Sequence, residues 1–239
     1  DVRFTYNSNA IEGNTLTQSE TQLVLEKGIT VGGKTLREHL EVVGHRDAID
    51  YVESLAQKET TIGEWEIRQI HSLLLSAIDR AEAGRYRQLD VKAAGTDYTY
   101  PPHYLLPELM AEFVTWLNSK AAQQLHPVDY AAEAHCRFVG IHPFRDGNGR
   151  TGRLLMNVLL LRSGYPVVVI TNQQRAEYIE ALVQAQQQDN VLAFQDLLLE
   201  AAQQSLVEVL RMVVTATESQ TKGQDFYGEI LRFLDQANA

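Results

Sequence analysis

The chain from residue 141 to residue 153 reads IHPFRDGNGRTGR. This stretch holds one histidine, one aspartate, one asparagine and three glycines, and two of its arginines, Arg150 and Arg153, lie three residues apart. A long apolar run, Leu154–Leu161, follows directly. No other part of the chain concentrates so many groups that can hold charge or move a proton. We therefore take it as the loop around which the remaining sequence builds a helical frame.

Helices are predicted on both sides of this loop. Pro127 suits a first helical turn, so one helix should run from there to Ile141. A second should cover residues 151–162 and stop at Gly164. Capping signals and the spacing of apolar residues predict further helices over residues 8–13 (with Ser8 as N-cap), 17–28 and 61–78 (each opened by a Thr-x-x-Glu capping box), 35–57, 106–122, 172–182, 192–214 and 226–234.

Between residues 83 and 102 the pattern alternates more than it spirals, which favours an exposed hairpin-like flap closed by Pro101 and Pro102. Seven or more helices with one small β-hairpin indicate an all-α fold, a helical bundle. The polar stretch at residues 215–224 is typical of a linker. We expect an N-terminal segment at 1–30, a core at 31–214, and a linker with a C-terminal helix at 215–239.

Composition narrows the functional class. The 239 residues carry a net charge of −10, which argues against broad, non-specific nucleic-acid binding. The single cysteine, Cys136, excludes an intrachain disulfide and a cysteine-based metal site. No apolar run reaches the ~18–20 residues of a membrane span, and nothing resembles a signal peptide, so we expect a cytoplasmic protein without a membrane partner. The start at Asp1, without Met, indicates a fragment of a longer chain.

The Gly147-Asn148-Gly149 turn predicts an anion site. Two glycines let successive backbone N–H groups point to one spot, and the helix that follows adds its unpaired N–H groups and the positive end of its dipole. Arg150 and Arg153 share a helix face, and each can fork onto phosphate oxygens. Together these groups predict a polyphosphate site.

Asp146 stands where phosphate would repel a carboxylate. A Mg²⁺ ion held jointly by Asp146 and phosphate oxygens removes this conflict. His142 is the residue of this loop that can exchange a proton near neutral pH. Taken singly, a Gly-Asn-Gly turn, a capping histidine and paired arginines have ordinary structural explanations. Their concentration in one short loop favours attack by a hydroxyl group on phosphorus.

Residues 142–153 resemble, without departure, the signature of Fic-domain proteins, His-x-Phe-x-Asp/Glu-Gly-Asn-Gly-Arg-x-x-Arg. The resemblance extends over about residues 8–200, and includes residues 83–87, 116–118, 126–127 and 164–166. It implies the all-helical Fic fold and a nucleotidyltransferase activity. A protein adenylyltransferase of this kind moves AMP from ATP to a hydroxyl side chain of a target protein or of itself (AMPylation), and pyrophosphate leaves.

The resemblance also implies residue roles. His142 would deprotonate the Ser, Thr or Tyr hydroxyl of the target, and Asp146 would hold Mg²⁺ against the α- and β-phosphates. The residues implied in ATP binding are Gly147, Asn148, Gly149, Arg150, Thr151, Gly152, Arg153, Tyr178 and Gln186. Of these, Gly147 to Gly149 would form the anion hole, the two arginines would grip the outer phosphates, and Tyr178 and Gln186 would lie near the nucleoside. Similar proteins often carry Asn in place of Gln186. The flap, at Thr96, Asp97, Tyr98 and Thr99, would dock the backbone of the target protein by β-augmentation.

A second resemblance lies near the N-terminus. Residues 8–14 read SNAIEGN, similar to the Fic inhibitory motif Ser/Thr-x-x-x-Glu-Gly/Asn. A glutamate at position 12 that reaches Arg153 would occupy the place of a γ-phosphate and push ATP into an unproductive pose. The alternative is that Ser8 and Glu12 only cap a short surface helix. With the Fic motif downstream, we favour autoinhibition.

Two other functions stay open. The same loop could work in reverse, with Glu12 orienting a water that removes AMP from a modified protein. Alternatively, the core could sense a nucleotide as part of a transcriptional regulator. In that case the helix at 226–234 would begin a winged-helix domain, and DNA would be a partner only if this domain exists beyond the chain. A homodimer that affects inhibition also fits the family.

Overall fold

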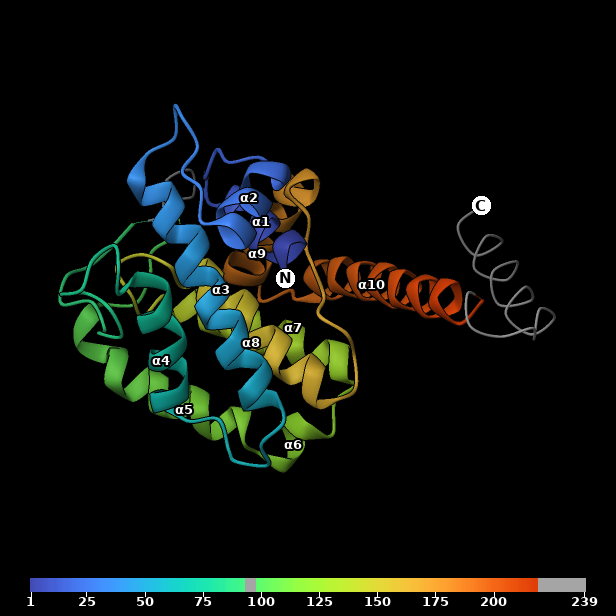
Figure 1. The fold of residues 1–239 in the computed structure, drawn as a ribbon. Coiled ribbons are helices and arrows are strands. Elements are labelled where there is room, and N and C mark those ends of the chain that lie inside the picture. Colours follow the sequence, from blue (N-terminus) through green and yellow to red (C-terminus); the bar gives the residue numbers. More distant parts are fainter. Residues whose placement is uncertain (93–97, 219–239) are drawn as a thin grey trace.

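The computed structural model describes residues 1–92 and 98–218, and this part of the chain is helical throughout (Figure 1). Its α-helices are α1 (Val2–Ile11), α2 (Gln18–Lys27), α3 (Leu36–Ala56), α4 (Glu64–Leu75), α5 (Leu106–Leu117), α6 (Lys120–Gln123), α7 (Pro127–Ile141), α8 (Asn148–Arg162), α9 (Arg175–Gln188) and α10 (Leu192–Glu218). Two 3₁₀ turns are added, η1 (His103–Leu105) and η2 (Asn172–Gln174). The all-α prediction is confirmed.

Helices α7 and α8 form the centre of the molecule, and the motif loop joins them (Figure 1). Helix α8 is buried on all sides, as expected for a helix that is apolar around most of its circumference. Helices α3 and α4 pack against α8, while α5 and α10 pack against α7. The loop between α7 and α8 is therefore held at both ends by the best-packed part of the core.

The N-terminal helix α1 packs on α3 and on the start of α9, and it reaches α8 (Figure 1). Phe4 and Ile11 are each 3% exposed and belong to the main core. A smaller cluster of Leu16, Val24 and Val42 fixes α2 on α3. The N-terminal segment is therefore part of the packed structure in this conformation.

Several helix boundaries differ from the sequence predictions. Helix α1 begins at Val2, so Ser8 lies inside it, 1% exposed, and does not cap it. The capping box at Thr17 is present. The one expected at Thr61 is not: Gly63 is the N-cap of α4, and its N–H donates to the Glu66 carboxylate. The helix therefore starts two residues later than predicted, and Glu66, not Glu64, is the glutamate at position N3. The Thr-x-x-Glu pattern alone does not show which residue has the extended backbone of an N-cap, because packing decides that.

Two further predicted elements, the helix at 106–122 and the linker at 215–224, differ from the structure. The predicted helix at 106–122 is divided, because the Asn118 side chain donates to the Val114 carbonyl and Ser119 then caps α6. Helix α10 continues through Glu218, so residues 215–218 of the predicted linker are helical. The remainder of the linker and the helix predicted at 226–234 lie outside the described residues.

The flap is only partly described. An antiparallel bridge joins Lys92 to Thr99, on either side of residues 93–97. Thr96 and Asp97, expected to dock the target, fall outside the described residues, so the hairpin stays a prediction. Within residues 1–92 and 98–218, no helix is both long and apolar enough to cross a membrane.

Candidate active site

The motif loop is braced from inside. The Asn148 side chain accepts a hydrogen bond from the Phe144 N–H (2.9 Å) and donates one to the Phe144 carbonyl (2.8 Å). Phe144 is fully buried. The Asn148 side chain therefore fixes the shape of the loop.

A buried histidine on α4 supports the same loop. His71 stacks on Phe144 with ring centroids 3.7 Å apart, and its Nδ1 accepts the Gly84 N–H. Its Nε2 must then carry the proton, which it donates to the Asp146 carbonyl (2.9 Å). Burial lowers the pKa of His71 to about 4. A neutral histidine thus ties Asp146 to α4.

Arg87 is a supporting residue that sequence reasoning missed. It is 2% exposed and donates to the backbone carbonyls of His142 (2.9 Å), Leu89 (3.0 Å) and Pro101 (2.5 Å). It therefore joins the end of α7 to the base of the flap. Arg87 lies in the stretch 83–87 that resembles the family. An arginine in a polar turn, however, does not show from sequence that it will bind backbone carbonyls such as those of His142 and Pro101.

His142 is held in the geometry of a proton acceptor. It ends α7 in the left-handed conformation, with φ at 52°, and its ring stacks on Tyr100 at 4.0 Å. Nδ1 lies 3.4 Å from the Val139 carbonyl, which can only accept. The Nε2 lone pair is therefore the basic one. Burial lowers the pKa of His142 to about 4, so the ring is neutral at physiological pH.

The anion site lies at the start of α8. Gly147 has φ at 78°, and a Cβ there would lie 2.9 Å from Leu75. A Cβ on Gly149 would collide with the Glu12 carboxylate, so Glu12 lies directly over the turn that should receive phosphate. Thr151 is fully buried and Gly152 packs on His135, so their expected part in nucleotide binding stays a prediction.

Arg153 is fully engaged by two other helices. It is 1% exposed, and its guanidinium donates to the Ser8 hydroxyl (3.1 Å), the Ser8 carbonyl (2.7 Å) and the Glu12 carboxylate (2.8 Å) of α1. A fourth bond goes to the Tyr178 hydroxyl of α9 (3.0 Å). Although burial lowers the pKa of Arg153, the partners raise it further, so it stays charged.

Tyr178 lies behind Arg153. It is 3% exposed, and its hydroxyl also bonds His135 at 3.0 Å. In this conformation Tyr178 supports Arg153, and the expected contact between Tyr178 and the nucleoside stays a prediction. Gln186, by contrast, is accessible and lies beside the Tyr100 hydroxyl.

Four charged side chains surround the entrance on the other side of the loop. Asp146 Oδ1 accepts the Gly147 N–H (2.6 Å) and lies 3.4 Å from Arg150, while Oδ2 accepts Arg37 (2.6 Å). Glu41 lies 3.2 Å from Arg37 and 3.7 Å from Arg150. Arg150 is 2% exposed, so the two motif arginines are buried against different partners.

The donor set fits a metal that arrives with phosphate. In residues 1–92 and 98–218, no three His, Cys, Asp or Glu side chains form a metal cluster. Asp146 supplies a single half-exposed carboxylate, next to a turn of N–H groups. Mg²⁺ is commonly held by one or two carboxylates together with substrate phosphates. Arg150 Nε and Nη1 make no hydrogen bond in the described part of the chain, and Nη1 lies 3.7 Å from the Glu41 carboxylate, so both atoms can still donate to such a ligand.

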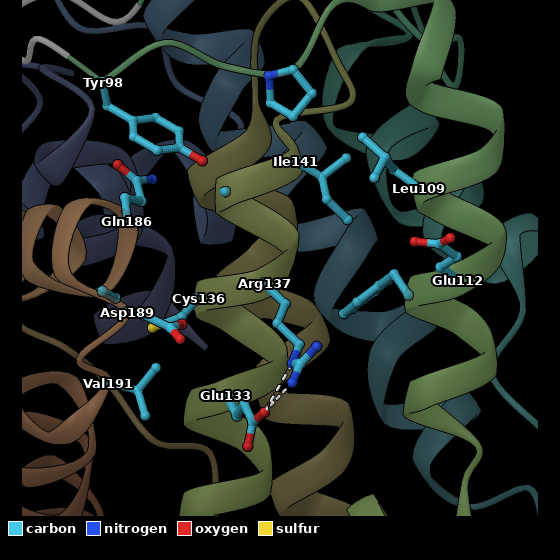
Figure 2. Close-up of a pocket in the computed structure, with 14 residues that line it drawn as sticks. Tyr98, Leu109, Glu112, Glu133, Cys136, Arg137, Ile141, Gln186, Asp189 and Val191 are labelled. Carbon is cyan, nitrogen blue, oxygen red and sulfur yellow. Dashed lines mark hydrogen bonds and ion pairs between the residues drawn. The ribbon is translucent and has the colours of Figure 1, made fainter.

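A groove of about 430 Å³ leads away from this loop beneath the flap. Figure 2 shows α7 as its floor, with Leu109 and Glu112 of α5 on one side and Gln186 and Asp189 of α9 on the other. Tyr98 of the flap covers its upper end, close to Ile141, the residue before His142. The groove therefore extends to the residue before His142, and His142 itself does not line it.

Comparison with known proteins gives one consistent result. The model of the Fic/DOC family matches residues 61–160. The curated protein adenylyltransferase Fic of Nematostella vectensis is 46% identical over 185 residues, which cover 77% of this chain and 43% of that protein. The chain thus spans less than half the length of this curated relative.

Solved structures show the same relationship. A fragment of Fic-1 from C. elegans superposes with a TM-score of 0.81 at 35% identity, over 92% of this chain and 64% of the other. A Fic domain containing signaling protein from Bacteroides thetaiotaomicron matches with a TM-score of 0.77 at 32% identity, over 85% of this chain and 84% of that one.

Proposed function

Because this chain belongs to the Fic/DOC family, we propose that it is a protein adenylyltransferase, which transfers AMP from ATP to a hydroxyl side chain of a target protein or of itself. The observation that carries the proposal is a convergence. The Nε2 of a neutral His142, the carboxylate of Asp146 and the backbone N–H groups that begin α8 belong to one short, rigid loop. The relatives named protein adenylyltransferase support the choice of AMP as the group transferred.

The residues divide the work as follows. His142 takes the proton of the attacking hydroxyl at Nε2, and its low pKa means that no proton must first be lost. The N–H groups at Gly147–Gly149 stabilise the charge that grows on the phosphate oxygens. Asp146, together with phosphate oxygens, would hold Mg²⁺, which supplies charge neutralisation for the pyrophosphate leaving group.

We further propose that α1 inhibits this reaction. The Glu12 carboxylate lies over Gly149 and uses Arg153, so an outer phosphate cannot take the same place. The flap, with Tyr98 and Thr99, and the groove beneath it would receive the target segment next to His142.

Mass spectrometry of the Glu12→Gly protein after incubation with ATP and Mg²⁺ tests both proposals. We expect a gain of one AMP per chain, at least tenfold faster than in the unmodified protein, because the outer-phosphate position becomes free. The double variant Glu12→Gly/His142→Ala serves as control and should not gain mass. An unlabelled Glu12→Gly protein, or equal labelling of the control, would refute the adenylyltransferase.

A second candidate is favoured by one observation. Glu12 is 40% exposed while it contacts Arg153, so its free oxygen can orient a water beside the anion site. The enzyme would then remove AMP from a modified protein. In that case Glu12→Gly abolishes release of AMP from a pre-labelled protein, whereas an inhibitory role for Glu12 predicts unchanged or faster turnover of the label. Homodimer formation and DNA binding through a further domain stay predictions from sequence.

A further inference from the structure

The charged group at the entrance of the site contains a cation that the Fic motif does not include. Arg37 of α3, Asp146, Arg150 and Glu41 form a closed ring in which each arginine contacts both carboxylates. With two positive and two negative side chains, the ring is neutral. Any further cation at Asp146 therefore has to displace one that is already there.

The two carboxylate oxygens of Asp146 are not equivalent. Oδ1 accepts the Gly147 N–H at 2.6 Å and faces Arg150. Oδ2 is turned outward, and there Arg37 Nη2 lies at 2.6 Å. A Mg²⁺ ion binds oxygen at about 2.0–2.1 Å and requires the lone pair for itself. The oxygen best placed to bind the metal is thus the one that Arg37 covers.

The members of the ring are also unequally exposed. Arg150 and Glu41 are 2% and 14% exposed, and the Asn14 side chain additionally holds Glu41 at 2.9 Å. The side chains of Arg37 and Asp146 are 56% and 48% exposed, so water can replace their contact. Arg37 and Glu41 lie one helical turn apart on α3, so Arg37 keeps a partner when it leaves Asp146.

We propose that Arg37 is a resident counter-cation of Asp146, which a divalent cation must displace, so that Arg37 sets the metal concentration at which the site takes up a metal–nucleotide complex. This inference rests on the proposed role of Asp146 as metal ligand. Arg37 acts here as a positioning residue: it keeps the Asp146 carboxylate in place and neutral overall while no metal is bound. Its charge then opposes the incoming cation at close range.

Calorimetric titration of ADP at a series of Mg²⁺ concentrations tests the inference without catalysis. In Arg37→Ala, the Mg²⁺ concentration that gives half of the full ADP affinity should fall roughly two- to fivefold, the range that one exposed ion pair supports. Arg37→Lys keeps the charge, and its midpoint should stay near that of the unmodified protein. Arg46→Ala is the matched control, because Arg46 lies on the same helix and also pairs with an acidic residue one turn away.

The outcomes separate the inference from the proposed function. If the ADP affinity of the unmodified protein does not depend on the Mg²⁺ concentration, the proposed metal site at Asp146 is wrong, and the inference about Arg37 is refuted as well. If Mg²⁺ strengthens binding but Arg37→Ala leaves the midpoint unchanged or raises it, only the inference is refuted. An equal loss of ADP affinity with and without Mg²⁺ also refutes it, since Arg37 would then be a phosphate ligand. Arg37 is on the surface, so these variants should fold normally.

Discussion

Two ion pairs flank the predicted anion site, and they differ most in the burial of their arginines. Glu12 and Arg153 meet on the inner side, where Arg153 is 1% exposed and makes four hydrogen bonds. Arg37 and Asp146 meet on the outer side, where both side chains are about half exposed. A buried charge is costly to leave unpaired, whereas an exposed pair exchanges readily with water and ions. The inner pair is therefore suited to stabilise the inhibited conformation, and the outer pair is suited to control how readily the site takes up a metal ion.

The largest contrast should appear in stability. Replacing Arg153 by Ala removes the donor for two Ser8 oxygens, Glu12 and the Tyr178 hydroxyl. We expect the free energy of unfolding to fall by about 1–3 kcal/mol, because the buried acceptors lose their partner while the remaining Glu12 carboxylate is 40% exposed. Arg37→Ala should cost less than about 1 kcal/mol. Denaturant unfolding of both variants measures the difference. Equal losses would mean that the two pairs do not differ in the way their burial indicates.

Acid should weaken the fold around the inner side. Burial lowers the pKa of His71 to about 4, of His135 to about 3 and of His142 to about 4. In the unfolded chain these rings protonate near pH 6.5, so the unfolded state binds more protons between pH 6.5 and about 4. Burial lowers the pKa of His45 as well, so four rings contribute. Stability should therefore be flat above pH 7 and fall by up to about 5 kcal/mol per pH unit below 6. Thermal unfolding from pH 8 to pH 4.5 measures this, and His135→Gln should make the dependence shallower.

The same low pKa predicts the pH profile of labelling. In Glu12→Gly, self-labelling should not show the acid limb near pH 6.5 that an ordinary histidine gives, because His142 stays neutral down to about pH 4. Initial rates between pH 8 and pH 5 measure it. A half-maximal rate near pH 6.5 would contradict the burial of His142 in the active state.

The coupling energies of the two ion pairs should respond differently to salt. At 1 M ionic strength the Debye length is about 3 Å, so the coupling energy of Arg37 with Asp146, at most about 1 kcal/mol at low salt, should vanish. The coupling between Glu12 and Arg153 should persist, because the guanidinium is shielded from ions. Double-mutant cycles at 50 mM and 1 M NaCl measure both couplings. A salt-sensitive inner pair would show that α1 opens readily in solution.

The smallest shift of the Mg²⁺ midpoint is expected for a change at Asn14, which connects the two sides. Its side chain donates to the Glu38 carbonyl at 3.0 Å and to Glu41 at 2.9 Å, two residues after Glu12. Asn14→Ala should lower stability by about 1 kcal/mol. It should also shift the Mg²⁺ midpoint of ADP binding by less than Arg37→Ala does, because it acts on Asp146 only through Glu41. A larger shift would place the control of the metal site in the N-terminal segment.

The sequence predicted correctly those features that depend only on residues near one another in the chain. The Fic motif, the all-helical class and the starts of α2 and α7 all follow from residues close together in the chain. It failed where partners come from elsewhere. The Ser8 hydroxyl looked like a helix cap and instead accepts a hydrogen bond from Arg153, and no local pattern indicated that Arg87 donates to the His142 carbonyl.

The sequence by itself determined that a histidine, a carboxylate and a glycine turn stand together at a helix start, because twelve consecutive residues cannot lie far apart. Only the tertiary structure decided how these groups are used. Burial makes His142 neutral, α1 brings Glu12 over Gly149, and α3 brings Arg37 to Asp146 from more than a hundred residues away. Helical spacing does not encode such contacts, because they depend on which faces of α1, α3 and α8 pack together.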